Sequence, residues 1–270
     1  MKVHNKVILV TGAGSGIGRE LALNLLAKGA RVAGVDLAPE PLDRTATLAG
    51  REAHAFGQFI ADISQRAVVE GLPGQILAHF GAIDGIINNA GIIQPFCRLN
   101  DLEYPTIERV LNVNLFGTLF VTKAFLPHLL LRPEAHIVNI SSMGGFVPVP
   151  GQTMYCAAKA AVKLMTEGLA AELIHTGVRV TVVFPGAVAT NILANSATGS
   201  PRSADGGVAA HALPAAEAAR VIVRAIEQNT ERVFVGKDSA FMDRFYRLSP
   251  GYAARAIANK MRGLLPVAQP

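Results

Sequence analysis

A tyrosine and a lysine stand four residues apart in the stretch YCAAK, at Tyr155 and Lys159. In a helix, residues four apart lie on the same face, one turn from each other. Such a pair can be a surface contact, a buried tyrosine with a lysine packed along it, or a device for moving a proton. The two residues alone do not decide among these, so the choice depends on what the rest of the chain places around them.

A glycine cluster, TGAGSGIG at 11–18, follows an apolar run directly and opens a helical pattern. Gly12 permits a tight turn, Gly16 lets the backbone approach a pyrophosphate, and Gly18 lets helix and sheet pack closely. The free N–H groups and the dipole of the helix N-terminus favour phosphate. A glycine-rich turn without a ligand is the alternative, which this position between strand and helix disfavours. The cluster lacks the Gly-Lys-Ser/Thr ending of a P-loop.

Asp36 ends the second apolar run, at the distance from Gly12 where dinucleotide-binding domains carry an acidic residue. A carboxylate there accepts hydrogen bonds from the 2′-hydroxyl of an adenosine ribose and repels a 2′-phosphate. Neither Ser15 nor Leu37 supplies a positive charge, and Arg19 lies one position into the helix, where it can point elsewhere. The alternative for Asp36 is a plain strand-end turn. The sequence therefore predicts NAD(H) rather than NADP(H).

Apolar runs rich in Val and Ile alternate with helical patterns along the chain. Because parallel strands covered by helices on both faces read as continuous apolar runs, we predict an α/β fold, a Rossmann-like doubly wound seven-stranded parallel sheet. We expect a single domain over 1–270, with the catalytic core at 1–236 and a loop at 191–213. The predicted strands are 6–10, 31–36, 54–62, 83–91, 136–142, 179–186 and 232–236, and the main predicted helices are 16–29, 103–131, 153–175 and 214–228.

Composition argues against several other classes of protein. The chain has 270 residues, half of them hydrophobic, which is enough for one large α/β domain. It contains no uninterrupted apolar run of membrane-spanning length, and its first residues enter a strand pattern at once, so we expect neither a membrane span nor a signal peptide. Two cysteines, Cys97 and Cys156, suggest no disulfide framework and a cytoplasmic location. The histidines lack metal-binding spacing, so no metal is expected.

Six motifs in order make the chain resemble the classical short-chain dehydrogenase/reductase family from about residue 5 to 236. They are the glycine spacing Gly12, Gly16, Gly18; NNAG at 88–91; NVN at 112–114; ISSMGG at 140–145; YCAAK at 155–159; and PGAVAT at 185–190. Each motif alone is weak, but the ordered set is not expected by chance. The resemblance implies an NAD-dependent oxidoreductase that transfers hydride between a nicotinamide cofactor and an alcohol or ketone.

The resemblance also assigns the catalytic residues Asn114, Ser142, Tyr155 and Lys159. Ser142, and not Ser141, has the family's spacing to the tyrosine, so Ser141 is expected to support the strand end. Tyr155 would be the general acid/base, Ser142 would hydrogen-bond the substrate oxygen, and Asn114 would hold a water that links Lys159 to solvent. A free tyrosine has a pKa near 10, so a phenolate at pH 7 needs about 4 kcal/mol of help, which Lys159 and an oxidised nicotinamide would provide.

The resemblance further implies a set of cofactor contacts, many of them through the main chain. Asp62 would meet the adenine, while Val188 and Thr190 would meet the nicotinamide carboxamide. The full set is Gly12, Ser15, Gly16, Ile17, Gly18, Asp36, Leu37, Asp62, Ile63, Asn88, Asn89, Ala90, Gly91, Tyr155, Lys159, Pro185, Gly186, Val188 and Thr190.

The residues expected to border the substrate are mostly apolar and include no arginine or lysine that could hold a carboxylate or phosphate. We therefore predict an uncharged, hydrophobic alcohol or ketone, with steroids, retinoids and lipids as candidates, and a 191–213 loop that closes over it. The expected residues are Gln94, Phe96, Met143, Phe146, Met154 and Leu193.

The segment 237–270 forms a basic tail. It carries six basic and two acidic residues, hence +4 of the net charge of +5, and a break is expected at Pro250-Gly251. Phe241, Phe245 and Leu248 share one helical face, so an amphipathic helix pair packed on the core or on another subunit is favoured over a membrane-surface anchor or a lid for a lipid-like substrate. No basic patch with interleaved aromatics crosses the core, so nucleic acid is not an expected partner.

Family members are commonly homotetramers or dimers built on long helices, here 103–131 and 153–175, so a homo-oligomer is expected. Two rival functions stay open at this point. One is an NADP(H)-dependent carbonyl reductase. The other is a catalytically idle NAD-binding sensor or scaffold, which the complete set of Asn114, Ser142, Tyr155 and Lys159 disfavours.

Overall fold

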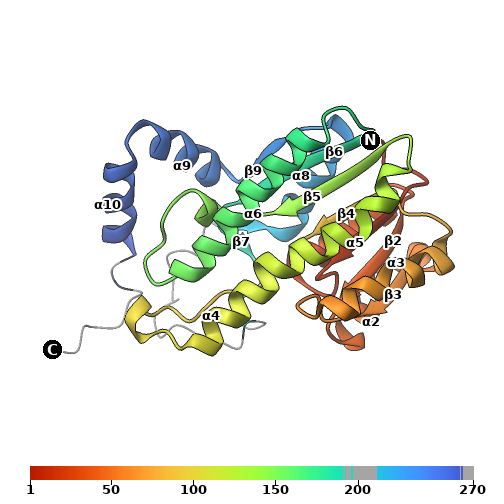
Figure 1. Ribbon diagram of the computed structural model, residues 1–270, viewed down its shortest axis with the longest axis horizontal. Coiled ribbons are helices and arrows are strands. Elements are labelled where there is room, and N and C mark those ends of the chain that lie inside the picture. The colour runs from red at the N-terminus through yellow and green to blue at the C-terminus, as the bar shows by residue number, and fades with distance from the viewer. Residues whose placement is uncertain (191, 193–195, 197–211, 262, 264–270) are drawn as a thin grey trace.

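The computed structural model describes residues 1–190, 192, 196, 212–261 and 263. Seven strands form one parallel sheet in the order β3-β2-β1-β4-β5-β6-β9, which confirms the predicted Rossmann-like, doubly wound sheet (Figure 1). The strand order reverses between β1 and β4, which is where such sheets bind their ligands. The strands are β1 (Val7–Thr11), β2 (Arg31–Asp36), β3 (Phe56–Ile60), β4 (Gly85–Asn88), β5 (Ala135–Ile140), β6 (Val178–Pro185) and β9 (Arg232–Val235).

Helices pack on both faces of the sheet. Because side chains alternate across a strand, Ile8 and Val10 face one hydrophobic core while Val7 and Leu9 face the other. The first core is closed by α1 (Gly16–Ala27), α2 (Pro39–Ala49) and α8 (Ala215–Gln228), and the second mainly by α3 (Arg66–Phe80) and α5 (Thr118–Leu130), with the end of α6 (Thr153–Glu172). Short 3-10 turns lie at Gly50–Ala55, Leu99–Asp101 and Met143–Gly145.

The single helix predicted for 103–131 is interrupted. It consists of α4 (Tyr104–Leu111), a π-helical turn η3 (Asn112–Gly117) and α5. A π-turn inside an α-helix is frequently found at a functional site, and this one contains Asn114. By length and composition alone, 104–130 could cross a membrane, yet its Val121, Phe125 and Leu129 are fully buried in the core beside the sheet.

One other difference from prediction lies after β6. A second small sheet pairs β7 (Val188–Ala189) with β8 (Leu213–Pro214), and strands this short leave no periodic signal in a sequence. Most of the predicted 191–213 loop lies outside the described residues.

The tail forms two helices, α9 (Lys237–Leu248) and α10 (Pro250–Lys260), which stand at one end of the molecule (Figure 1). The break falls at Ser249, just before the predicted position, because Pro250 can begin a helix where its missing N–H is not needed. α9 packs against β9 and the turn Met143–Gly145. Phe245 lies against Phe241 and Tyr252, with ring centroids 5.8 Å apart in each pair.

Candidate active site

A cavity of about 980 Å³ lies at the carboxyl ends of the strands, where the strand order reverses. Its wall includes the turn after β1, the ends of β2 and β5, the segment after β4, the first turns of α6 and the segment after β6. The predicted cofactor residues that line it are Gly12, Ser15, Gly16, Ile17, Asp36, Leu37, Asp62, Ile63, Asn89, Ala90, Gly91, Tyr155, Lys159, Pro185, Gly186, Val188 and Thr190.

Gly18 and Asn88, by contrast, lie behind the cavity wall. A Cβ on Gly18 would overlap the carbonyl oxygen of Gly12, so glycine is needed there for close packing, as the sequence predicts. Asn88 is buried and donates to Asn139 Oδ1 at 2.8 Å and to Thr122 Oγ1 at 3.0 Å, so its side chain ties β4 to β5 and α5. Asn88 is therefore a structural residue and not a cofactor contact, which corrects the expectation.

The turn before α1 fits the diphosphate of a dinucleotide. Gly12 and Gly16 have φ of 68° and 51°, a conformation that residues with a side chain rarely adopt. A Cβ on Gly16 would stand 3.3 Å from Thr190, across the space that a dinucleotide would occupy. The first turn of α1 carries no acidic residue, so its N–H groups are open to an anion without a competing negative charge.

Asp36 lines the cavity beside two arginines. Its Oδ2 accepts a hydrogen bond from the N–H of Gly14 and its Oδ1 one from the N–H of Leu37, both at 2.8 Å. Arg19 was expected to be free to point elsewhere, but its guanidinium donates to the Gly14 carbonyl and it lines the cavity. Arg44, from α2, also lines the cavity, and the sequence analysis missed it. This end of the site therefore presents the Asp36 carboxylate together with the guanidinium groups of Arg19 and Arg44.

Three of the four predicted catalytic residues meet at the opposite end of the cavity. Tyr155 and Ser142 both line the cavity, close enough for Ser142 to affect the pKa of the phenol, and the Ser142 Oγ accepts a hydrogen bond from the N–H of Gly144 at 3.0 Å. Lys159, one helical turn along α6, has its Nζ 5.9 Å from the centre of the Tyr155 ring and donates to the Ile140 carbonyl at 2.9 Å. Tyr155, Ser142 and Lys159 therefore bring a phenol, a hydroxyl and an ammonium group to the same end of the cavity.

Ser141 lies beside this group without joining it. Its hydroxyl is buried and donates to the main-chain carbonyl of Lys159 at 2.8 Å. Ser141 therefore ties the end of β5 to α6, the supporting role that the sequence predicts.

Burial sets the ionisation of both groups. It raises the pKa of Tyr155 to about 12, although the hydrogen bond from Ser142 acts in the opposite direction. It lowers the pKa of Lys159 to about 8, since an ammonium loses its hydration there. In the protein alone the pKa of Tyr155 is therefore raised by burial, and not lowered by Lys159 as expected. Tyr155 can therefore act as a base near neutral pH only when a bound group brings further positive charge into the cavity and lowers the pKa of the phenol.

Asn114 is fully buried in the π-turn and does not line the cavity. Its side chain binds the main chain of Ile92 twice: Oδ1 accepts from the N–H at 2.9 Å and Nδ2 donates to the carbonyl at 2.8 Å. A Cβ on Gly91 would stand 2.8 Å from Asn114 Oδ1 and 3.3 Å from Lys159 Nζ. Asn114 therefore fixes the segment after β4 close to Lys159, and its role in holding a water stays a prediction.

The predicted substrate residues are placed differently from expectation. Gln94 is fully buried: its Oε1 accepts from the N–H groups of Met154 and Tyr155 at 2.9 and 3.1 Å, and its Nε2 donates to the Gly151 carbonyl at 3.0 Å. It is therefore a cap on the first turn of α6. In the sequence, Gln94 is a polar residue in an apolar segment. That pattern fits a helix cap and a substrate contact equally well, so it could not distinguish the two roles.

The other described members of that set are also absent from the cavity wall. Phe146 packs edge-on against Phe184 and Phe234, with ring centroids 5.4 and 6.1 Å away. Phe96, Met143 and Met154 are partly buried outside the wall, and Leu193 lies outside the described residues. Apolar residues that do line the cavity include Ile92, Ile93 and Ile192. Ile92 and Ile93 follow NNAG directly, and that adjacency could have identified them.

Residues 6–200 match the model of the short chain dehydrogenase family, and the fold and the tyrosine site agree with that match. The chain belongs to the short-chain dehydrogenase/reductase family, and it is an oxidoreductase that acts on CH–OH groups with a nicotinamide cofactor.

Relatives are similar over most of the chain. A putative oxidoreductase, SadH, of Mycobacterium tuberculosis is 36% identical, over 98% of this chain and 99% of its own. A 2-(S)-hydroxypropyl-CoM dehydrogenase of Xanthobacter autotrophicus is 35% identical, over 75% and 79%. Among solved structures, a 3-ketoacyl-(acyl-carrier-protein) reductase of Brucella melitensis, complexed with NADH, is 28% identical over 86% of this chain and 96% of its own, with a TM-score of 0.76.

Proposed function

We propose that this protein is an NAD-dependent dehydrogenase or reductase of hydrophobic secondary alcohols and ketones, with Tyr155 as the general acid/base. The observation that carries the proposal is that Ser142, Tyr155 and Lys159 line the same cavity, with Lys159 Nζ 5.9 Å from the centre of the Tyr155 ring. A sensor that binds NAD without catalysis would not need these three side chains to lie together at the cavity.

In the oxidation direction, the Tyr155 phenolate takes the proton from the substrate hydroxyl, and the Ser142 hydroxyl donates to the same substrate oxygen as its charge changes. The cofactor, when bound, supplies the hydride acceptor and, when oxidised, a positive charge near the phenol. With a Tyr155 pKa of about 12, forming the phenolate at pH 7 costs about 7 kcal/mol in the protein alone. The positive charge of an oxidised nicotinamide would lower this cost. Reduction runs the same proton transfer in reverse.

NAD is the proposed cofactor because Asp36 ends β2 beside the cavity, where its carboxylate would accept from ribose hydroxyls and repel a 2′-phosphate. Arg19 and Arg44 favour a second candidate, NADP(H), since a guanidinium can bind a phosphate with two hydrogen bonds. The increase in thermal stability with NADH and with NADPH at equal concentration separates the two, because the tighter ligand stabilises more. A larger shift with NADPH would overturn the NAD assignment.

The substrate is proposed to be uncharged and apolar because Ile92, Ile93 and Ile192 line the cavity near Tyr155. The similar proteins whose names state an activity act on hydroxypropyl-CoM, on 3-ketoacyl groups and, for levodione reductase, on levodione. The three names all indicate a secondary alcohol or a ketone as the reacting group, but the rest of the substrate differs from one protein to the next.

The test is NADH formation across a panel of secondary alcohols, steroids and retinoids, with the Tyr155→Phe variant as control. Tyr155→Phe keeps the ring and removes the hydroxyl, so we expect kcat to fall by about 10²- to 10⁴-fold with NADH binding retained. A variant with full activity would overturn the mechanism. A wild-type protein that binds NADH but oxidises or reduces nothing on the panel would favour the sensor.

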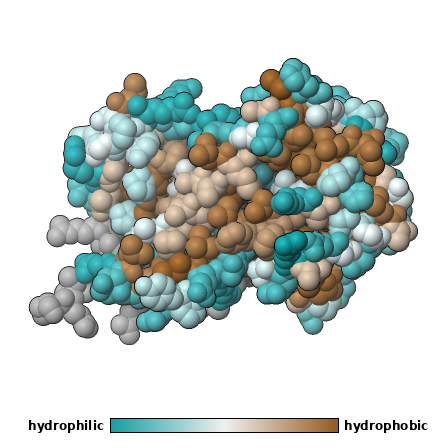
Figure 2. Space-filling model, viewed as in Figure 1, coloured by the Kyte–Doolittle hydropathy of each residue, from teal (hydrophilic) through white to brown (hydrophobic). Residues whose placement is uncertain are grey.

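A homo-oligomer is also proposed, in a cytoplasmic setting. Hydrophobic residues gather over the face formed by α5 and α6 (Figure 2), where Phe116, Leu130 and Leu164 are exposed by 39%, 46% and 67%. An apolar face of this kind commonly marks a protein–protein interface. Light scattering of wild type and of Leu164→Glu tests it: we expect a dimer or tetramer that the charge weakens, and a monomeric wild type would contradict the proposal.

A further inference from the structure

The tail helix α9 reaches the wall of the cavity through its first turn. The N–H of Gly186 bonds the Val235 carbonyl at 2.9 Å, so β6 and β9 stay paired up to the cavity. Gly236 then turns the chain, with φ of 101°, and α9 begins at Lys237. The residues of this first turn therefore lie against the segment that follows β6.

Asp238, in that turn, bonds the segment directly. Its Oδ2 accepts a hydrogen bond from the N–H of Ala187 at 2.8 Å. A Cβ on Gly186 or on Gly236 would overlap the same carboxylate, so the two glycines make room for it. Both neighbours of Ala187, Gly186 and Val188, line the cavity. One exposed carboxylate of the tail thus holds the main chain of the cavity wall.

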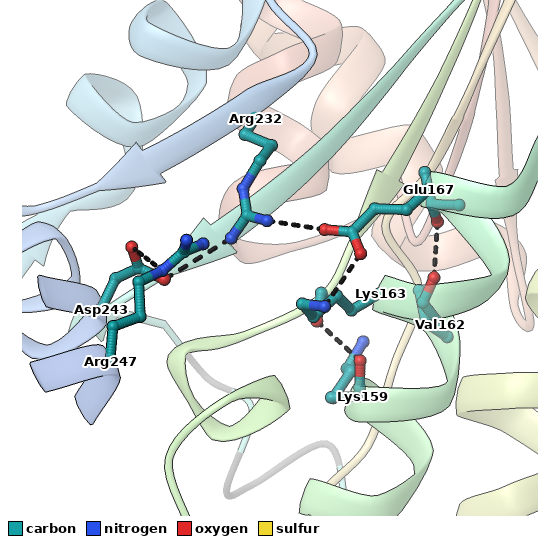
Figure 3. A network of polar contacts seen from close by, with 9 residues as sticks. Lys159, Val162, Lys163, Glu167, Arg232, Asp243 and Arg247 are labelled. Carbon is teal, nitrogen blue, oxygen red and sulfur yellow. Dashed lines mark hydrogen bonds and ion pairs between the residues drawn. The ribbon is translucent and has the colours of Figure 1, made fainter. Parts of the chain in front are cut away.

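Other contacts fix α9 against the core, so that Asp238 is held in place. The hydroxyl of the next residue, Ser239, is fully buried and donates to the Phe184 carbonyl of β6 at 2.8 Å. Farther along α9, Asp243 belongs to a network of ion pairs that Figure 3 shows.

The network joins α9 to the helix that carries Tyr155. Arg232 of β9 lies between Glu167 of α6, at 2.8 Å, and Asp243 of α9, at 3.5 Å (Figure 3). Lys163 of α6 pairs with the same Glu167 at 2.9 Å, and Arg247 pairs with Asp243 at 3.0 Å. Charges from three elements therefore connect the tail, the last strand and the catalytic helix.

We propose that Asp238 is a positioning residue for the nicotinamide half of the cofactor: it fixes the Gly186–Val188 segment and so sets how that half is held. The inference rests on the proposed cofactor function. It assigns α9 a role within the site, whereas the sequence analysis placed the tail outside it. The adenosine and diphosphate half would be held by Gly12, Gly16 and Asp36, which Asp238 does not touch.

The Kd values for two ligands, ADP-ribose and NADH, distinguish this role from a general loss of structure. ADP-ribose carries the adenosine and diphosphate but lacks the nicotinamide, whereas NADH carries both. In Asp238→Ala, we expect the Kd for NADH to rise about tenfold and the Kd for ADP-ribose to change by less than about twofold. Asp238→Asn keeps an acceptor oxygen for the Ala187 N–H and is expected to recover most of the NADH affinity.

Glu217→Ala is the matched control, because Glu217 is a carboxylate in the first turn of another helix, α8, and does not line the cavity. It should leave both Kd values unchanged. An equal loss of NADH and ADP-ribose binding in Asp238→Ala, or no loss of NADH binding, would overturn the inference. A wild-type protein that binds neither ligand would instead overturn the proposed function itself.

Discussion

The two ends of the cavity are built in different ways. At the adenosine end, Gly12, Gly16 and Asp36 belong to one β-α-β unit, and much of the surface offered to a ligand is main chain. At the catalytic end, Ser142 follows β5, Tyr155 lies in the first turn of α6 and Val188 follows β6. One end is local in sequence, while the other is assembled by the fold.

The supports differ as well. The adenosine end depends on glycine conformations, and the side chains of Asp36, Arg19 and Thr45 bond its turn. The catalytic end is surrounded by buried polar side chains, among them Gln94, Asn114 and Ser141, each bonded to main chain. Because buried polar groups need their partners, this end is the more rigid and the more easily damaged. Substitutions at the adenosine end should therefore change binding, and those at the catalytic end should change kcat.

The largest difference between an effect on turnover and an effect on binding is expected from Lys159→Met. Methionine keeps much of the length but removes the ammonium that favours the phenolate of Tyr155, so kcat should fall by about 10²- to 10³-fold. Steady-state kinetics with NAD varied checks this result. A loss confined to KM would contradict the assignment of Lys159 to the catalytic end.

The same variant should be more stable than the wild type. Because the pKa of Lys159 is lowered from 10.5 to about 8, the folded protein binds fewer protons than the unfolded chain between these values. The buried ammonium therefore destabilises the fold fully below pH 8, by about 3 kcal/mol, and this cost disappears as the pH rises to 10.5. Urea unfolding at pH 7 and at pH 10 should show a gain in Lys159→Met that is larger at pH 7.

The sequence predicts the sheet well because its strands are buried on both faces. Val7–Thr11 is apolar up to its last residue and Arg31–Asp36 is apolar between its two charged ends for that reason, and a short Gly-rich turn follows the first of them. The motifs around Tyr155 also predict positions in space, since strand ends in a parallel sheet meet at one edge. Residues fixed by such local rules are the ones that the sequence places correctly.

Residues that act across the fold are not predicted in this way. The π-turn at Asn114 has no sequence period of its own, and the 103–131 pattern is typical of one continuous helix. Gln94 and Asp238 each bond main-chain groups that are distant in sequence, so nothing near them indicates their partners. Arg44 reaches the cavity because α2 is packed there, and packing is set by the whole core.

Substitutions of two buried glutamines test which side chains hold the catalytic end in place. Gln94→Leu removes the acceptor for two N–H groups of α6, so we expect a stability loss of about 2–4 kcal/mol. The displacement of Tyr155 should lower kcat about tenfold with little change in the KM for NAD.

Gln152 is the control, since it is also buried but its Nε2 makes one bond, to the Gln94 carbonyl at 2.8 Å. Gln152→Leu should lower kcat much less than Gln94→Leu. Chemical denaturation and kinetics at saturating NAD measure the two effects separately. Equal losses of kcat in both variants would mean that Tyr155 depends on general packing and not on the Gln94 cap.

The smallest effect on turnover is expected at the adenosine end. Asp36→Ala removes an acceptor for ribose hydroxyls together with the bond to the Gly14 N–H, so the KM for NAD should rise about tenfold while kcat stays within about twofold. Its preference for NAD over NADP should also fall, because the carboxylate no longer opposes Arg19 and Arg44. Asp43→Ala removes a nearby exposed carboxylate that is not part of the cavity wall and should change neither value. If Asp36→Ala lowered kcat as far as Gln94→Leu does, the two ends would be mechanically coupled, and the division of binding from turnover between them would be wrong.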